Sequence, residues 1–387
     1  MLPPSMVATA SKPKKRTVSR KIATESPYTG RIERLRTLLA RQGDLECLLV
    51  THPLDVGYLT GFLGGDSYLV VGRGRPLIIS DFRYEEELNE ARSLVDVHIR
   101  RSAINAATAE VLEARGIDRC AVQAEHLTLA EFKALGKLAR HTRLAPTTGL
   151  VPSLRARKDE HEIDLMKQAI RIQEQALLAV LPSIKPGQTE LSIAARLEAE
   201  MKSRGSSRPG FESIVAARTN GSLPHYRPGT TKAAANQPLL IDWGAVYRGY
   251  QGDMTRTFTL GRWPRKVREL YTIVLEAQEM AAAALAPGRT THEIDRIARD
   301  HIAAHGYGEQ FGHGLGHGLG LVKEPPYLHP MYDPIPLEVG HVCTVEPGIY
   351  LPGVGGVRIE DLYVIRERGA ENLCSLPKDI DWATLSV

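Results

Sequence analysis

Apolar and polar positions follow two different periods along the first part of the chain. Short apolar runs bounded by turn residues predict strands, and apolar residues at helical spacing predict helices. The predicted strands are Leu45–Thr51, Ser67–Val71, Pro76–Ser80, Val95–Ile99 and Arg119–Gln123. The predicted helices are Arg31–Arg41, Phe82–Ala91, Ile104–Arg115 and Leu127–Arg140. Strands that alternate with helices are typical of an α/β domain.

A domain boundary is predicted in the segment Leu150–Lys158, which is basic and contains Pro152. The chain of 387 residues exceeds the size, about 250 to 300 residues, at which a single hydrophobic core stops growing. We therefore predict a disordered basic tail at residues 1–29, an amino-terminal domain at 30–152 and a catalytic domain at 153–387.

The second domain contains an internal repeat. The segments Pro186–Gly205 and Pro287–Gly306 are each 20 residues long and share five identities at a constant offset of 101. Each follows a predicted helix, Glu160–Leu181 or Val267–Leu285, and each precedes a strand-rich region. This order of elements indicates two structural half-repeats, and their pseudo-symmetry predicts paired contributions to one central site.

Composition and charge are those of a folded globular protein, with 43% hydrophobic and 24% charged residues. The formal charge of +4 is too balanced to favour a nucleic-acid or membrane partner for the folded body. No apolar run reaches the about 20 residues that span a bilayer. The first 23 residues lack a secretory signal, and four scattered cysteines form no CxxC pair, so we predict a cytoplasmic location.

Two aspartates lie on a predicted hairpin. Asp242 is within the apolar run Leu239–Gly244, and Asp253 precedes Met254–Phe258, with a turn in Tyr247–Tyr250. If the turn has two central residues, both carboxylates project from one face and, directly opposed, lie about 5 Å apart. Buried carboxylates this close repel each other unless a proton or a cation intervenes, so a metal is the simplest explanation.

The second half repeats this arrangement with Glu346 and Glu360 on another predicted hairpin. Between the halves, the glycines of Phe311–Gly320 let the backbone pass close to a site into which imidazoles project. Such an oxygen-rich set with one histidine suits two Mn²⁺, Co²⁺, Fe²⁺ or Zn²⁺ ions about 3.5 to 4 Å apart, bridged by a nucleophilic hydroxide. The predicted ligands are Asp242, Asp253, His317, Glu346 and Glu360.

Five short motifs occur in the order found in a known family. They are Ile241–Gly244, Gly252–Thr257, Gly316–Leu321, Val345–Tyr350 and Gly356–Asp361. With these motifs the chain resembles the pita-bread metallopeptidases, which include Xaa-Pro aminopeptidase, prolidase and methionine aminopeptidase, together with creatinase. Ser80–Tyr84 resembles the amino-terminal domain of the Xaa-Pro branch and creatinase, which methionine aminopeptidases lack. The resemblance implies an α/β (α+β) protein with a creatinase-like, RNase H-like amino-terminal domain before a pseudo-twofold pita-bread catalytic domain.

The resemblance also implies roles for the five predicted ligands. Asp242 chelates one ion, Asp253 and Glu360 bridge both, and His317 and Glu346 complete the other site. Glu346 also serves as the general base when the hydroxide attacks the scissile carbonyl.

Three further residues are assigned to catalysis or substrate binding. His225 matches a family histidine that contacts substrate, the alternative being a histidine of a surface loop. Arg358 is expected to orient carboxylates at the substrate site, the alternative being an exposed strand arginine. The family's second histidine, which helps to polarise the scissile peptide, is missing from Leu321–Pro326, where Lys323 or Glu324 takes its place. His313 is the predicted substitute.

The leading functional prediction is an Xaa-Pro peptidase of aminopeptidase P or prolidase type. It is expected to cleave the bond before proline in peptides or dipeptides, with two divalent ions, first of all Mn²⁺, and to form a homodimer. One alternative is a nonpeptidase hydrolase or lyase on the same fold, although creatinase lacks the metal ligands that this chain keeps. The other is a noncatalytic peptide-binding protein, resembling the pita-bread domain of the FACT histone chaperone, but clustered carboxylates are costly to keep without a metal.

Overall fold

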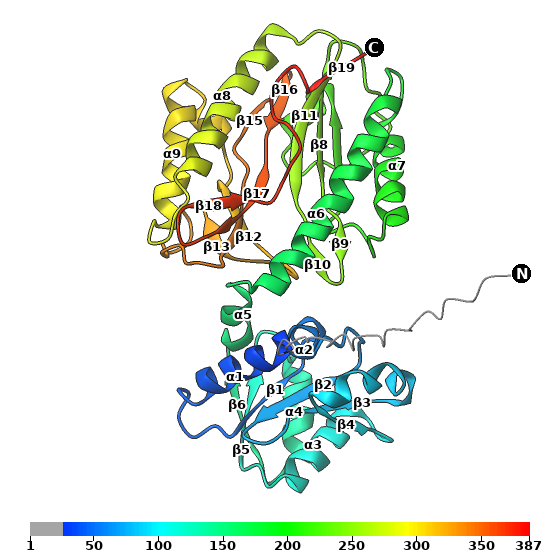
Figure 1. The fold of residues 1–387 in the computed structure, drawn as a ribbon, viewed down its shortest axis with the longest axis vertical. Coiled ribbons are helices and arrows are strands. Elements are labelled where there is room, and N and C mark those ends of the chain that lie inside the picture. Colours follow the sequence, from blue (N-terminus) through cyan, green and yellow to red (C-terminus); the bar gives the residue numbers. More distant parts are fainter. Residues whose placement is uncertain (1–25) are drawn as a thin grey trace, which may run out of the picture.

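The computed structural model describes residues 26–387 and divides them into two domains joined through helix α5 (Leu150–Arg155) (Figure 1). The predicted basic tail lies outside the described residues as far as residue 25. Helix α1 (Pro27–Leu39) begins within the last residues of that predicted tail. The predicted boundary after residue 152 falls inside α5, so the linker is itself helical.

The amino-terminal domain is built on a mixed sheet of six strands in the order β4-β3-β2-β1-β5-β6. Its strands are β1 (Cys47–Val50), β2 (Tyr68–Gly72), β3 (Leu77–Ser80), β4 (Asp96–Ile99), β5 (Arg119–Gln123) and β6 (Arg143–Thr147). Its remaining helices are α2 (Pro53–Thr60), α3 (Ile104–Ala114) and α4 (Leu129–Leu138). Apolar side chains on both faces of the sheet are buried, as an α/β domain requires.

One predicted element of this domain is wrong, and one strand was missed. The predicted helix Phe82–Ala91 is replaced by three short 3₁₀ turns, because only Leu88 and Ala91 within it are buried and no apolar stripe forms. Strand β6 was not predicted, since Pro146 and exposed polar residues interrupt its pattern. It is an edge strand that pairs only with β5, where proline is tolerated.

The carboxy-terminal domain places four long helices outside two main sheets (Figure 1). The helices are α6 (Glu160–Val180), α7 (Glu190–Ser203), α8 (Arg265–Ala283) and α9 (Thr291–Ala304). The first sheet has the order β19-β11-β8-β7 and contains β7 (Ile214–Ala217), β8 (Pro238–Trp243), β11 (Met254–Leu260) and β19 (Thr384–Leu385). The second has the order β13-β12-β14-β17-β18 and contains β12 (Gly316–Leu319), β13 (Lys323–Leu328), β14 (Val342–Val345), β17 (Asp361–Ile365) and β18 (Ala370–Asn372). Two ribbons are inserted in the sheet hairpins: β9 (Val246–Tyr247) with β10 (Tyr250–Gln251), and β15 (Gly348–Leu351) with β16 (Gly355–Arg358).

The two halves repeat each other in backbone detail around α7 and α9. Gly187 and Gly288 have φ values of 92° and 84°, and each donates its backbone N–H to a carbonyl 2.8 Å away. Thr189 and Thr290 then cap the helices through their hydroxyl groups. Positive φ favours glycine, so the shared glycines of the sequence repeat have the same conformational cause in both halves.

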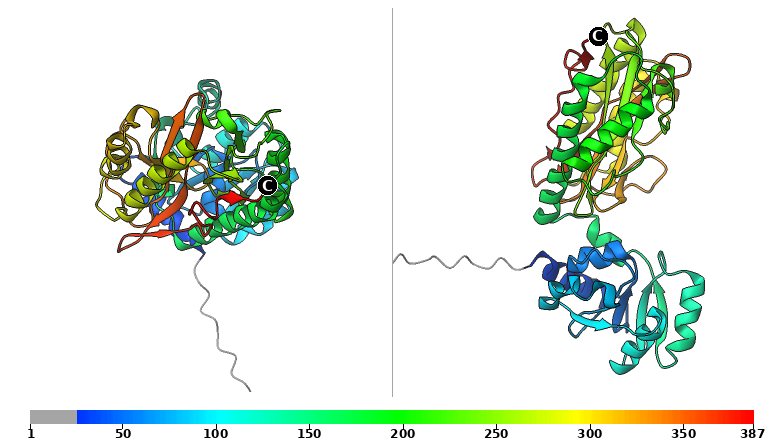
Figure 2. Two further views of the ribbon diagram at one scale, coloured as in Figure 1. Left: turned by 90° about the horizontal axis from the view of Figure 1, so that it is seen from above. Right: turned by 90° about the vertical axis from the view of Figure 1, so that its right-hand side faces the viewer.

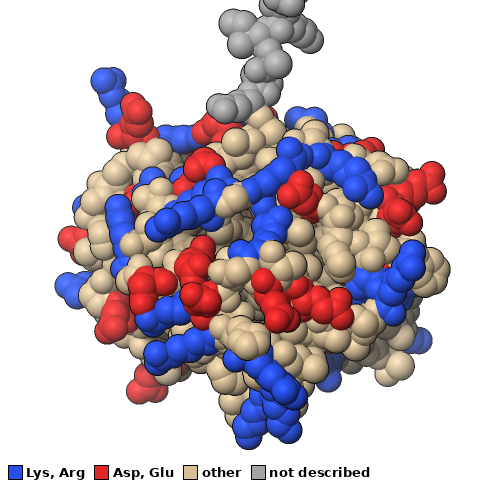
Figure 3. All heavy atoms as spheres, turned by 90° about the horizontal axis from the view of Figure 1, so that it is seen from below, with Lys and Arg blue, Asp and Glu red and all other residues tan. Residues whose placement is uncertain are grey.

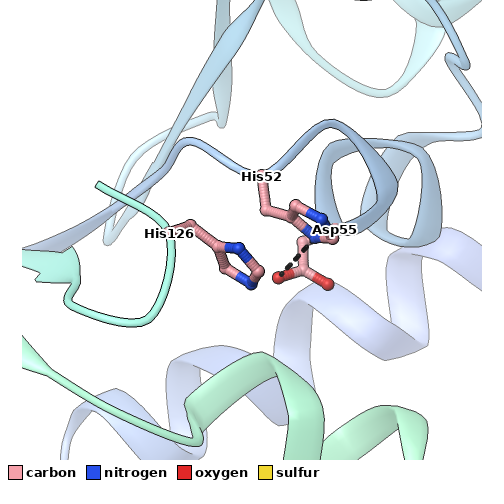
Figure 4. A group of neighbouring side chains, drawn as sticks. All are labelled: His52, Asp55 and His126. Carbon is pink, nitrogen blue, oxygen red and sulfur yellow. Dashed lines mark ion pairs between the residues drawn. The ribbon is translucent and has the colours of Figure 1, made fainter. Parts of the chain in front are cut away.

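Helix α5 connects the two domains (Figure 2), and buried ion pairs join them as well. Arg155 pairs with Asp55 of the amino-terminal domain and, at 3.0 Å, with Glu324 of β13. Lys158 reaches the other oxygen of Glu324 at 2.8 Å. Next to Asp55, the imidazoles of His52 and His126 stack face to face (Figure 4). Arg155 of the linker helix thus connects Asp55 of the amino-terminal domain with Glu324 of the catalytic domain.

On the face of the molecule shown in Figure 3, basic and acidic side chains are interspersed. None of the helices within residues 26–387 is long and apolar enough to cross a membrane.

Candidate metal centre

The first two carboxylates come from the β8–β11 hairpin. Asp242 lies near the end of β8, Asp253 directly precedes β11, and both side chains line one hollow, as the two-residue turn predicts. That turn is at Arg248 and Gly249, which both have positive φ, the requirement of a type I′ turn. Thr255, not Asp253, stands directly opposite Asp242, so the prediction of direct opposition is wrong. A turn centred between residues 248 and 249 sets this register.

The second half supplies two carboxylates from equivalent positions. Glu346 directly follows β14, and Glu360 directly precedes β17, which pairs with β14. The ribbon β15–β16 lies between them, as β9–β10 lies between Asp242 and Asp253. Each half therefore provides one carboxylate near the end of one strand and one before its hairpin partner. These are the paired contributions that the sequence repeat predicts.

His317, on β12, brings an imidazole to the four carboxylates. Its Nε2 lies 3.6 Å from Asp253 Oδ2 and 3.4 Å from Glu346 Oε1. Its Nδ1 is 3.1 Å from the Gly318 carbonyl, which can only accept, so the lone pair is on Nε2. Ligand atoms of Asp253, His317 and Glu360 lie within 4.8 Å of one another.

Glycines on both sides of His317 let β12 pass close to its neighbours. A Cβ on Gly316 would lie 2.0 Å from the Thr344 carbonyl oxygen, and one on Gly318 would lie 2.2 Å from that of Glu324. The Gly-rich motif is thus required by strand packing as well as by the approach of the backbone to the site.

Burial makes the charged forms of these acids costly. Burial and the adjacent Asp242 and Glu346 carboxylates raise the pKa of Asp253 well above its ordinary value. Burial and the Asp253 carboxylate do the same to the pKa of Glu360, and burial raises the pKa of Asp242. Burial, with Lys323 nearby, lowers the pKa of His317 to about 4. The cluster therefore favours bound protons or a cation that offsets its negative charge.

The donor set fits divalent cations. Asp242 Oδ1 and Glu360 Oε1 are buried and have no hydrogen-bond partner within residues 26–387. Buried carboxylate oxygens are normally satisfied, and a cation would satisfy both these oxygens and the crowded negative charge. Carboxylate oxygens with one imidazole suit first-row divalent ions.

Arg358 links Asp242 to two aromatic side chains. Its Nη2 donates to Asp242 Oδ2 at 2.5 Å, and its Nη1 donates to the Tyr350 hydroxyl at 2.9 Å. The Tyr350 hydroxyl lies 2.9 Å from His313 Nε2, and His313 Nδ1 lies 2.8 Å from the Gly314 carbonyl. Arg358 is only 3% exposed, which excludes the alternative of an exposed strand arginine.

Thr255 is a site residue that sequence reasoning missed. Its hydroxyl donates to Glu360 Oε2 at 2.7 Å and accepts from Arg358 Nε at 3.0 Å. The turn position was the available signal, because a turn at Arg248–Gly249 places Thr255 opposite Asp242. Tyr350 was also missed, although it lies within a quoted motif.

The two residues that replace the expected second histidine have different environments. Glu324 points toward the domain interface, where it is 3% exposed and paired with Arg155 and Lys158. Lys323 lines the hollows beside His317 and Glu346. The pairing of β12 with β13 shifts register between His317 and Gly318.

Two adjoining hollows, with volumes of about 290 and 550 Å³, open onto the candidate metal centre. Both are lined by Asp242, His317, Glu346 and Lys323. His225 lines both as well, and its side chain is exposed. His313 and Arg358 line the smaller hollow. The structure thus gathers every predicted site residue around one space.

Comparison with known families matches two models to this architecture. The model of the Creatinase/Prolidase N-terminal domain matches residues 31–157, and that of metallopeptidase family M24 matches residues 164–367. The second range contains all five candidate ligands and more than half of the chain. The chain belongs to metallopeptidase family M24. The pita-bread catalytic domain and the creatinase-type amino-terminal domain are thereby confirmed.

Several relatives share the whole M24 architecture. A peptidase of Bacillus subtilis, YqhT, is 36% identical over 90% of this chain and 99% of its own. The solved Xaa-Pro dipeptidase from Bacillus anthracis superposes with a TM-score of 0.88 and 34% identity, covering 93% of this chain and 100% of its own. The X-Pro aminopeptidase from Thermotoga maritima has a TM-score of 0.84 and 33% identity, with coverage of 92% and 100%.

Proposed function

We propose that this M24 protein is a metal-dependent Xaa-Pro peptidase of aminopeptidase P or prolidase type. The observation that carries the proposal is the buried cluster of four carboxylates and His317 beside two hollows. The solved relatives named for Xaa-Pro dipeptide and X-Pro peptide cleavage support the choice of substrate. These relatives include both types, so the preferred peptide length distinguishes prolidase from aminopeptidase P activity.

We propose that Asp242, Asp253, His317, Glu346 and Glu360 hold two divalent ions, with Mn²⁺ as our first choice. Asp253 and Glu360 are the proposed bridging ligands, since both precede hairpin strands of the two halves and their ligand atoms lie close together. When bound, the ions lower the pKa of a bound water and stabilise negative charge on the substrate carbonyl oxygen. The predicted homodimer stays a prediction from the resemblance.

Glu346 is the proposed general base. Its Oε1 accepts a hydrogen bond from Thr344 Oγ1 at 3.0 Å, and its backbone N–H is fixed to the Leu315 carbonyl at 2.8 Å. The carboxylate therefore has a defined position at the wall of both hollows. There it accepts the proton of the attacking water and passes it to the leaving nitrogen.

Arg358 and His225 are proposed to orient the reacting groups. Arg358 positions Asp242 and is itself fixed by Thr255 and Tyr350. His225 lies at the exposed side of the hollows, where a bound peptide passes. A peptide held in this way meets Glu346 in a fixed orientation, which is a large part of catalysis by proximity.

His313 is proposed to take over the role of the missing second histidine, with Lys323 as the neighbouring cation. His313 lines the smaller hollow, but its two ring nitrogens contact the Gly314 carbonyl and the Tyr350 hydroxyl. It therefore acts on the substrate only after giving up Tyr350. A lower turnover of His313→Ala would support this role, and unchanged turnover would eliminate it. Lys323→Ala, measured in parallel, reports whether the ammonium serves instead.

The test of the proposed function is hydrolysis of Ala-Pro, Ala-Pro-Ala and Ala-Ala by the Mn²⁺-loaded protein. We expect release of alanine from the proline peptides and little cleavage of Ala-Ala. Glu346→Gln should abolish turnover, whereas Glu367→Gln, an exposed carboxylate remote from the hollows, should not. No cleavage of either proline peptide by metal-loaded protein would contradict the proposal and favour nonpeptidase chemistry.

A further inference from the structure

Two other groups of metal-binding side chains occur within residues 26–387, and they differ in how their atoms are arranged. The first is His52, Asp55 and His126 (Figure 4). The two imidazole planes lie 7° from parallel with centroids 3.7 Å apart, so their in-plane lone pairs do not converge on one point. The Asp55 carboxylate is already bonded to Gln123 and Arg155. This group is a stacked pair beside a satisfied carboxylate.

The second group joins the outer surfaces of two helices that pack side by side. Glu276 is on α8, His301 is in the last turn of α9, and His305, four positions further on, is the residue that directly follows α9. One ligand atom from each of the three lies within 4.8 Å of the others. The rings of His301 and His305 are 4.6 Å apart and inclined at 51°, so they are not stacked like His52 and His126. Histidines four positions apart on a helix are a familiar pair of zinc ligands.

The nitrogen atoms of this group are prepared for a cation. His305 Nδ1 lies 2.9 Å from the His301 carbonyl oxygen, which can only accept, so His305 carries its proton on Nδ1 and its lone pair on Nε2. A backbone carbonyl on the other ring nitrogen is the usual support of a metal-binding histidine. His301 Nε2 is buried, lies 3.1 Å from Glu276 Oε2, and makes no hydrogen bond within the described chain.

The distance between His301 and Glu276 also suits a shared ion. Two ligand atoms at zinc distances in a tetrahedral arrangement lie about 3.3 Å apart. The observed 3.1 Å matches this separation. The same contact is an ion pair when His301 is protonated. A shared metal ion and an ion pair can therefore be distinguished at a pH where imidazoles are neutral.

We propose that Glu276, His301 and His305 form a further divalent-cation site, of the zinc class, which fastens α9 to α8. Two imidazoles and one carboxylate favour Zn²⁺ over the oxygen-preferring Mg²⁺ or Ca²⁺. Water completes the coordination, because Glu276 and His305 are exposed.

The site has a structural path to the candidate metal centre. On another face of α9, Asp295 accepts from the Leu315 backbone N–H at 3.0 Å. Arg299 donates to the His313 carbonyl at 2.8 Å. Helix α9 therefore holds the backbone that leads into His317, and an ion that fixes α9 to α8 stabilises this support.

The test is calorimetric titration of Zn²⁺ into the Mn²⁺-loaded protein at pH 8. We compare the wild type with Glu276→Gln, His301→Ala and His305→Ala. His292→Ala is the matched control, because His292 is half-buried on α9, as His301 is, and its Nε2 is engaged with the Tyr332 carbonyl. Exchange of Zn²⁺ for Mn²⁺ at the candidate metal centre contributes equally to every variant, so the difference between variants isolates the proposed site.

We expect the wild type and the control to bind one Zn²⁺ equivalent at the proposed site. Each of the three variants should bind this equivalent more than about 10-fold more weakly, because even the loss of a residue that supports a ligand lowers metal affinity by about 10- to 100-fold. Zn²⁺ should also raise the Tm of the wild type and control by more than that of the variants. Equal Zn²⁺ binding by the wild type and the three variants would overturn the proposal.

Discussion

Thr255 shows how one hydroxyl can fix the geometry of a charged site. It is fully buried, and it bonds Glu360 on one side and Arg358 on the other. Arg358 in turn holds Asp242, so the two halves of the candidate metal centre are linked through this side chain. Partners of this kind orient metal ligands and tune their affinity.

Thr255→Val is expected to weaken Mn²⁺ binding by about 10- to 100-fold, because valine keeps the shape and loses both bonds. Thr257→Val is the matched control, since the Thr257 hydroxyl bonds only the backbone of Arg358 and is equally buried. Calorimetric titration of both metal-stripped variants makes the comparison. If Thr257→Val loses as much Mn²⁺ affinity as Thr255→Val, the specific role of Thr255 is wrong.

His341 should make stability depend on pH. Burial, with Lys158 nearby, lowers its pKa from 6.5 to about 4, and its Nδ1 accepts from the Glu338 backbone N–H at 3.1 Å. The unfolded chain therefore binds a proton that the folded chain resists, and stability is lost as pH falls from 6.5 toward 4. The loss amounts to about 3 kcal/mol at most.

Urea unfolding of the wild type and His341→Gln at pH 7 and pH 4.5 measures this effect. We expect the wild type to lose more free energy of unfolding between the two pH values than the variant loses. Parallel pH profiles for the two proteins would show that His341 does not contribute.

The sequence indicated the five candidate ligands because each lies in a short motif with a simple local pattern. The contacts of Thr255, Tyr350 and Lys323 were not predicted. They depend on strand register and on packing between segments about a hundred residues apart, as in the bond of Thr255 to Glu360.

At the scale of elements, the half-repeat explains why the site is symmetric. Each half contributes a hairpin with an inserted ribbon, and each hairpin carries two carboxylates. Long amphipathic helices and apolar strands were predictable from periodicity. The structure of Phe82–Ala91 was not predictable in this way. Its charged residues are compatible with a helix, but the segment buries no apolar stripe that would stabilise one.

Equal effects are expected from Gly187→Ala and Gly288→Ala. Both residues have positive φ, and an added Cβ would meet nothing within 4 Å at either position. The cost is therefore conformational alone, about 1 to 2 kcal/mol in each half. Chemical denaturation measures both. A loss confined to one variant would mean that the two turns are not equivalent.

At the scale of the whole molecule, the amino-terminal domain supports the wall of the hollows through buried charges. Arg155 stands between Asp55 and Glu324, and Glu324 is next to Lys323 in the same strand. Removing one partner leaves uncompensated buried charge, which costs about 3 to 5 kcal/mol. Glu324, which with Lys323 stands where the family has its second histidine, is thus part of the contact between domains.

Arg155→Met is expected to destabilise the protein by that amount. Arg157→Met is the control, because Arg157 forms an exposed pair with Glu338 that contributes about 0 to 1 kcal/mol. Denaturant unfolding followed by tryptophan fluorescence compares them. Equal stability of the two variants would contradict a structural role for the buried network.

The central claim is that the five clustered ligands hold two catalytic ions. The most direct measurement is titration of metal-stripped protein with Mn²⁺ while Ala-Pro and Ala-Pro-Ala hydrolysis is followed. We predict activity that appears only with metal and saturates at two equivalents per chain, and no recovery in Asp253→Asn. Full hydrolysis by the metal-stripped protein, or undiminished activity of Asp253→Asn, would contradict the account.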